Sequence, residues 1–82
     1  MNGNDGKFIV YPDGKNLTIS LQLENAETAE VKIVNTAGIM VASTIVNGQI
    51  TSYKVNLMPG VYVAIAKTSA GRIYKSKPFV IR

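Results

Sequence analysis

The sequence contains no cysteine, no histidine and no tryptophan. Without cysteine, the chain forms no disulfide and offers no thiolate to a substrate or a metal. Without histidine, it lacks the usual general base and the commonest metal ligand, so no Ser–His–Asp triad can form. Serine and threonine are plentiful, but no motif of a Ser–Lys dyad surrounds them. These absences argue against an enzyme and against a zinc or copper site, and we expect no metal and no cofactor.

Long hydrophobic runs are missing as well, and none approaches the roughly 20 residues that a membrane-spanning helix needs. The first eight residues, MNGNDGKF, lack the basic and then apolar pattern of a signal peptide. A chain of 82 residues makes one domain of modest stability. We expect a soluble domain and, if it is secreted, a piece of a longer precursor.

Acidic residues are few, and none lies in an apolar strand where burial could raise the pKa of its carboxyl group. Glu24, Glu27 and Glu30 are spaced three apart, which favours a solvated face of one turn. Residues 2–6, NGNDG, are faintly similar to a calcium-binding loop but lack its spacing of acids. We interpret residues 1–6 as the remnant of a flexible linker and residues 7–82 as the domain.

Positive charge is concentrated at the end of the chain. The net charge is +4, yet residues 1–66 carry four lysines against five acids. The last 16 residues carry no acid and five cations, which are Lys67, Arg72, Lys75, Lys77 and Arg82. A nucleic-acid surface needs more cations and a groove or helix, so no nucleic-acid partner is expected.

Two interpretations of this basic tail remain open. Lysines and Pro78 on an outer strand protect a sheet edge against aggregation. Alternatively, an extended basic strand docks on a partner by adding to its sheet, and its charge steers it toward an acidic or anionic surface. A free edge also allows two copies to pair as an edge-strand dimer.

The apolar residues recur with a period of two almost throughout, which indicates strands with one buried face. In residues 16–23, for example, Leu17, Ile19 and Leu21 share one face, and Thr18 and Ser20 share the other. Seven such segments occur, at residues 7–11, 16–23, 30–35, 39–47, 49–57, 60–67 and 72–82. Residues 23–30 between two of them are interpreted as a loop.

Turn signals separate these segments. PDGK at 12–15, NTAG at 35–38 and TSAG at 68–71 each supply a glycine, and Asn47–Gly48 is the strongest hairpin signal in the chain. Short strands with turns every 8–12 residues predict an all-β fold, a seven-stranded antiparallel β-sandwich that is immunoglobulin-like. A small barrel is the alternative fold.

The same residues resemble the type A C-terminal sorting domain of proteins exported by the type IX secretion system of Bacteroidota. That family opens with a strand ending in Tyr-Pro and a Leu-x-Ile strand, here FIVYPDGKNLTISL at 8–21. A Val-x-Ile strand and a turn follow, here VKIVNTAG at 31–38. A Leu-x-x-Gly-x-Tyr motif and a basic, apolar last strand complete the pattern. They are matched by Leu57, Gly60, Tyr62, Gly71, Lys75, Lys77, Phe79, Val80, Ile81 and Arg82. Asp13–Gly14 replaces the frequent Asn-Pro, and Pro78 is unusual within the last strand.

The resemblance implies a secretion address that is not an enzyme. It implies an upstream passenger, passage through the periplasm to the cell surface or extracellular space, a translocon that reads the domain, and a sortase-like peptidase that cuts in or before residues 1–6. It places recognition in the last two strands, at Gly60, Tyr62, Gly71, Lys75, Lys77, Val80, Ile81 and Arg82. The alternative function is a stand-alone extracytoplasmic binding or adhesion module.

Overall fold

A computed structural model describes residues 8–23, 27–47 and 50–82 of the chain. The expected linker at residues 1–6 lies outside them. The described residues form eight strands and no helix. The strands are β1 (Phe8–Asp13), β2 (Asn16–Leu21), β3 (Ala29–Asn35), β4 (Met40–Val46), β5 (Ile50–Lys54), β6 (Gly60–Thr68), β7 (Ile73–Lys75) and β8 (Phe79–Ile81).

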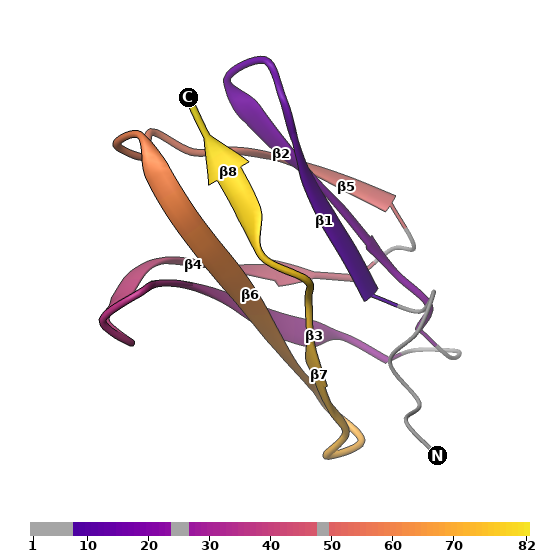
Figure 1. The fold of residues 1–82 in the computed structure, drawn as a ribbon. Helices are drawn as coiled ribbons and strands as arrows, with labels where there is room; N and C mark the ends of the chain where they lie inside the picture. Colours follow the sequence, from indigo (N-terminus) through magenta and orange to yellow (C-terminus); the bar gives the residue numbers. More distant parts are fainter. Residues whose placement is uncertain (1–7, 24–26, 48–49) are drawn as a thin grey trace.

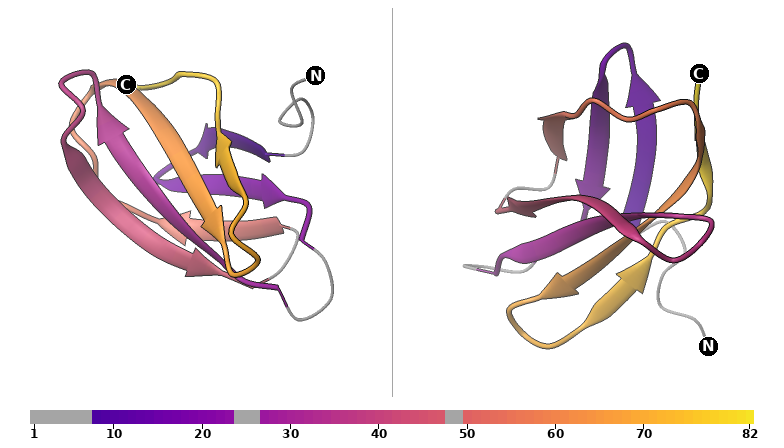
Figure 2. Two further views of the ribbon diagram at one scale, coloured as in Figure 1. Left: turned by 90° about the horizontal axis from the view of Figure 1, so that it is seen from below. Right: turned by 90° about the vertical axis from the view of Figure 1, so that its left-hand side faces the viewer.

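The strands form two antiparallel sheets that lie face to face (Figures 1 and 2). One sheet has the order β1-β2-β5. The other has the order β4-β3-β6-β7, and β8 also pairs with β6. The predicted all-β sandwich with antiparallel strands is therefore confirmed.

The core lies between the sheets and is built by the predicted alternation. Leu17, Ile19 and Leu21 of β2 are 0–1% exposed, and Val31 and Ile33 of β3 face them from the other sheet with no exposed surface. Full burial of such a side chain contributes about 1.5–3 kcal/mol. The remaining buried apolar residues of the core are Phe8, Val10, Ala29, Val46, Tyr62, Ala64, Ala66, Tyr74 and Phe79.

The hairpin predicted at Asn47–Gly48 is wrong. Residues 48–49 lie outside the described part, but the flanking strands belong to different sheets, because β4 pairs with β3 and β5 pairs with β2. The connection therefore crosses from one sheet to the other, and the Tyr53 hydroxyl on β5 donates a hydrogen bond to the Ser43 carbonyl on β4 at 3.1 Å. A turn signal reports local backbone preference only, whereas the partner of β5 is decided by the core that β5 covers.

The single strand predicted at residues 72–82 is interrupted. The structure divides it into β7 and β8, which both run antiparallel to β6. Lys75 pairs with Ile65, and Phe79 pairs with Tyr62. The segment from Lys75 to Phe79 is one residue longer than the segment of β6 from Tyr62 to Ile65 that it faces. Such an extra residue is the property of a β-bulge.

Ser76 holds the interrupted segment to β6. Its backbone N–H donates to the Ala64 carbonyl at 2.9 Å, and its Oγ accepts from the Ala64 N–H at 2.9 Å. Pro78 has no N–H to contribute to a ladder. The buried serine therefore supplies the bonds that a regular strand would have made here.

Candidate functional site

The residues that sequence reasoning selected lie on β6, on β7, on β8 and on their connections. Gly60 and Tyr62 belong to β6, and Gly71 lies in the turn between β6 and β7. Lys75 ends β7, and Lys77 precedes Pro78 in the bulge. Val80 and Ile81 belong to β8, and Arg82 follows them. β6, β7 and β8 are neighbours in the sheet that also contains β3 and β4, and they are the yellow and orange segments of Figure 1.

Tyr62 is a structural residue of this site. Its side chain is buried, its hydroxyl donates to the Met58 carbonyl at 2.6 Å, and its ring stacks on Phe79 with centroids 6.2 Å apart. Gly60 pairs with Ile81, and a Cβ on Gly60 would touch the Tyr62 ring at 3.7 Å. Tyr62 therefore holds β8 and the segment before β6 to the core, and Gly60 is the first residue of β6.

Gly71 closes the β6–β7 turn with a φ of 88°, in the left-handed region that glycine adopts without strain. Its N–H donates to the Thr68 carbonyl at 2.9 Å. The Thr68 N–H donates to the Arg72 carbonyl at 2.8 Å, and the Arg72 N–H donates to Thr68 Oγ1 at 3.0 Å. The conformation of the turn therefore depends on the absence of a side chain at Gly71.

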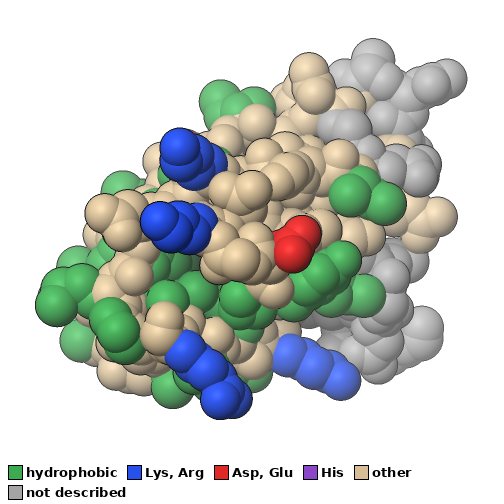
Figure 3. Space-filling model, turned by 90° about the horizontal axis from the view of Figure 1, so that it is seen from above, with side chains coloured by type: hydrophobic (Ala, Val, Ile, Leu, Met, Phe, Trp, Pro, Cys, Tyr) green, Lys and Arg blue, Asp and Glu red, His purple; other side chains and the backbone are tan. Residues whose placement is uncertain are grey.

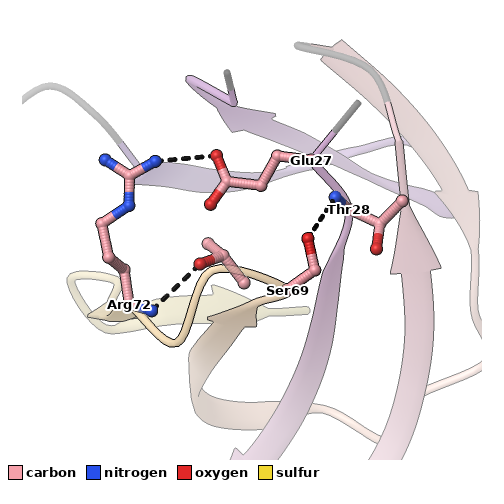
Figure 4. Close-up of polar contacts among 5 residues, drawn as sticks. Glu27, Thr28, Ser69 and Arg72 are labelled. Carbon is pink, nitrogen blue, oxygen red and sulfur yellow. Dashed lines mark hydrogen bonds and ion pairs between the residues drawn. The ribbon is translucent and has the colours of Figure 1, made fainter. Parts of the chain in front are cut away.

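A polar network fastens this turn to the segment before β3 (Figure 4). The Arg72 guanidinium donates to Glu27 at 2.7 Å. Ser69 Oγ accepts from the Thr28 N–H at 3.1 Å, and the Ser69 N–H donates to the Thr28 carbonyl at 2.8 Å. The network joins segments that lie more than forty residues apart in the sequence.

The expectation of a solvated face for Glu24, Glu27 and Glu30 is wrong at Glu27, which is 7% exposed. Glu24 lies outside the described residues, and the side chain of Glu30 is half exposed, 3.9 Å from the Lys32 Nζ. Sequence reasoning missed Glu27 because its partner, Arg72, is distant in the chain. The one local hint is that Glu27 lies two residues before β3, whose apolar face is buried.

The tail cations do not form one cluster. Arg72 is bonded to Glu27, whereas Lys75, Lys77 and Arg82 are exposed, as expected for outward-facing charges. Lys75 lies opposite Ile65 in the middle of β6, and Ile81 lies opposite Gly60, the first residue of β6. Ile65 is five residue steps from Gly60 along the strand, or about 16 Å at roughly 3.3 Å per residue. Arg82 is therefore far from Lys75.

The outer edge of β8 borders a groove. Within the described residues, β8 pairs with β6 alone, and β1 pairs with β2 alone. A hollow of about 550 Å³ lies between them, lined by Tyr11 and Pro12 of β1 and by residues 78–82. Val80 is 48% exposed beside this groove, and Ile81 is partly buried against the core.

No group of three or more Asp or Glu side chains that could hold a metal occurs among the described residues. The described part of the chain also contains no helix that is long and apolar enough to cross a membrane. The features that stand out are instead the free strand edges and the exposed cations.

The chain matches the model of a protein family described as the secretion system C-terminal sorting domain, over residues 9–82. It belongs to this family. No curated protein and no solved structure matches it. The match extends from the second residue of β1 to the last residue and includes β2 to β8 in full.

The sorting domain is a C-terminal signal for type IX secretion and not a member of a catalytic family. A type IX sorting domain interacts with the secretion machinery and is exported to the cell surface or extracellular space. The resemblance found in the sequence is therefore confirmed at the level of the family.

Proposed function

We propose that this sorting domain carries an upstream passenger from the periplasm across the outer membrane through the type IX translocon. A sortase-like peptidase then cuts before the domain and joins the passenger to anionic lipopolysaccharide at the cell surface. Membership of the family supports the role of the domain as an address. The proposed cut at residues 1–6 lies outside the described residues.

We also propose that the last strands are what the translocon reads. The supporting observation is the free edge of β8, which pairs on one side only and presents Val80 beside a groove. Lys75, Lys77 and Arg82 add exposed positive charge. In this proposal Gly60, Tyr62, Gly71 and Ile81 hold the strands in position, and the four exposed residues contact the partner.

A finer assignment of the fold accompanies this proposal. If β7 and β8 are counted as one interrupted strand, the sandwich has seven strands. The sheets β1-β2-β5 and β4-β3-β6-β7 then have the order of an immunoglobulin-like domain whose edge strand has moved to the second sheet. Three connections cross between the sheets, β2 to β3, β4 to β5 and β5 to β6, and they support this assignment.

The proposed function is tested by export of a reporter. Residues 1–82 are fused behind a monomeric periplasmic reporter in a bacterium with a working type IX system, and surface and periplasmic fractions are compared. The reporter is expected at the surface, and in the periplasm when the secretion system is deleted. Retention of the reporter in the periplasm beside an intact, protease-resistant domain would contradict the proposal.

The recognition residues are tested in the same assay. Lys75→Gln with Lys77→Gln, Val80→Asn and Arg82→Gln change exposed side chains, and each is expected to reduce surface display while the fusion stays folded. The matched control is Lys32→Gln, which removes an exposed charge from the same sheet. If all four variants are exported equally well, these residues are not the recognition surface.

A further inference from the structure

A hollow of about 640 Å³ lies at the end of the molecule where the chain terminates. Three segments distant in sequence enclose it: the β1–β2 turn with the start of β2, the end of β5 with the residues that follow it, and the last two residues. Figure 1 shows these segments together beside the C-terminus. We call this hollow the basic end pocket.

Three cations converge on the basic end pocket, because the sheet register brings them there. Lys54 lies on β5 opposite Asn16, the residue next to Lys15 in the β1–β2 turn. Arg82 follows Ile81, and Ile81 pairs with Gly60 at the start of β6. Gly60 comes directly after residues 55–59, which connect β5 to β6. All three cations are exposed and line the pocket.

No acidic side chain lines the basic end pocket, and Asp13 lies beside it, paired with Asn16 across the β1–β2 turn. The described residues that line the basic end pocket include neither Asp nor Glu, and Lys15, Lys54 and Arg82 form no ion pair within 4.0 Å in the described part of the chain. A free α-carboxylate on Arg82 would remove one unit of charge and still leave the pocket positive. Figure 3 views this end and shows Lys and Arg side chains among hydrophobic ones, with an acidic side chain near the middle of the view. Like charges that line one pocket repel each other, and an anion bound there would relieve that repulsion.

The floor of the basic end pocket is apolar. Leu17 is fully buried beneath it, and Leu57 and Ile81 are partly buried against the core. Its volume falls within the roughly 300–1,000 Å³ of pockets that hold a small ligand on an apolar lining with a few polar groups. Inorganic phosphate would use the cations but leave this floor uncovered. A ligand that uses both features of the pocket would combine negative charge with an apolar group.

We infer that the basic end pocket binds an acidic peptide segment of a protein partner, in which an apolar side chain lies between carboxylates. The groove along the free edge of β8 favours a peptide over a lipid, because it adjoins the pocket and shares Gly14, Ile81 and Arg82 with it. An extended segment can pair with this edge while its side chains enter the pocket. The inference that the pocket binds an acidic peptide does not depend on the proposed function. The inference that this peptide belongs to the secretion machinery rests on the proposed function.

The inference is tested in solution with the purified 82-residue chain. The probe is a fluorescein-labelled heptapeptide that alternates glutamate with leucine, and binding is followed by fluorescence anisotropy. We expect saturable binding that weakens as salt is raised, because exposed charges are screened. Replacing Lys15→Gln together with Lys54→Gln is expected to weaken binding at least tenfold.

The matched control is Lys32→Gln together with Lys67→Gln, which removes the same charge outside the basic end pocket. This control is expected to keep the affinity within twofold of the unaltered chain. All four positions are exposed, so both double variants are expected to fold, and circular dichroism with thermal melting verifies this. Equal losses of peptide affinity in the two double variants would mean that the peptide is attracted by the net positive charge of the domain and not by the pocket. That result would overturn the inference.

Two further probes distinguish the proposed peptide from a ligand that is only negatively charged and from an anionic lipid. A peptide of glutamate alone is expected to bind at least fivefold more weakly, and equal affinity would overturn the role of the apolar floor. Vesicles of phosphatidylglycerol that bind tightly when the peptide does not would overturn the peptide in favour of a lipid. Because these measurements need no secretion system, their failure leaves the reporter export result unaffected, and a failed export leaves the binding result unaffected.

Discussion

The ring of Tyr62 on β6 stacks on the ring of Phe79 on β8, with their centroids 6.2 Å apart and their planes 30° from parallel. Both side chains are buried, and the two residues are also a backbone pair in the sheet. This contact fixes the last strand to the core, so the exposed residues of β8 are displayed on a supported strand. It therefore links the stability of the domain to the presentation of its end.

Replacing Tyr62→Phe removes the hydroxyl that donates to the Met58 carbonyl and keeps the ring stack. We expect a loss of about 1 kcal/mol in the free energy of unfolding. In a domain of this size, that loss lowers the melting temperature by about 4–8 °C. The control is Tyr11→Phe, at an exposed tyrosine, where a change within about 0.5 kcal/mol is expected. Equal effects in the two variants would contradict the role of the bond to Met58.

Replacing Phe79→Ala empties a buried site beneath the ring of Tyr62. We expect a loss of about 3–5 kcal/mol, which is enough to unfold much of a marginal domain at 37 °C. Deleting residues 79–82 is expected to be at least as severe. Val80→Ala changes the neighbouring, half-exposed side chain and is expected to cost less than about 1 kcal/mol. Urea unfolding of the three proteins measures the difference, and a stable deletion variant would show that β8 does not support the core.

Replacing Arg72→Gln removes the guanidinium that bonds the buried Glu27 carboxylate at 2.7 Å. A hydrogen bond to a charged group contributes about 1.5–3 kcal/mol, and we expect a loss in this range. The control pair is Lys32 and Glu30, which lie 3.9 Å apart with both side chains half exposed. Lys32→Gln is expected to change the stability by less than about 0.5 kcal/mol. If both variants melt alike, the Glu27–Arg72 bond does not stabilise the turn.

Replacing Gly71→Ala forces a side chain onto a backbone with a φ of 88°. No atom lies within 4 Å of the added Cβ, so the cost arises from the backbone conformation alone. We expect a loss of about 1–2 kcal/mol. Gly71→Asn is expected to lose less, because asparagine adopts the left-handed region more readily. A thermal melt in which alanine and asparagine rank in the opposite order would contradict this explanation.

Replacing Lys75→Gln with Lys77→Gln is expected to leave stability within about 0.5 kcal/mol, because both side chains are exposed. This variant separates the two interpretations of the tail that the sequence left open. Edge protection predicts faster aggregation of a domain that still exports the reporter. Recognition predicts weaker export of a domain that stays monomeric, as measured by light scattering beside the fractionation assay.

The sequence by itself determined the all-β class, the buried faces of β2 and β3, the turns at Gly14, Gly38 and Gly71, and the family. Each of these depends on neighbouring residues, because alternation decides which side chains are buried and glycine decides where the backbone turns. The ordered motifs that carry the family resemblance are local in the same sense. The exposure of Lys75 and Lys77 was also predictable, since Tyr74 and Ser76 alternate with them on the buried side.

Only the tertiary structure decided which strands pair and which charges meet. Asn47–Gly48 has the residues of a hairpin, yet the two strands beside it cover the core from opposite sheets. Glu27 is buried because Arg72 reaches it from a distant turn, and Arg82 lies beside Lys15 and Lys54 in the basic end pocket rather than near Lys75. The free energy of pairing between distant segments depends on the whole core, and no local pattern in the sequence records it.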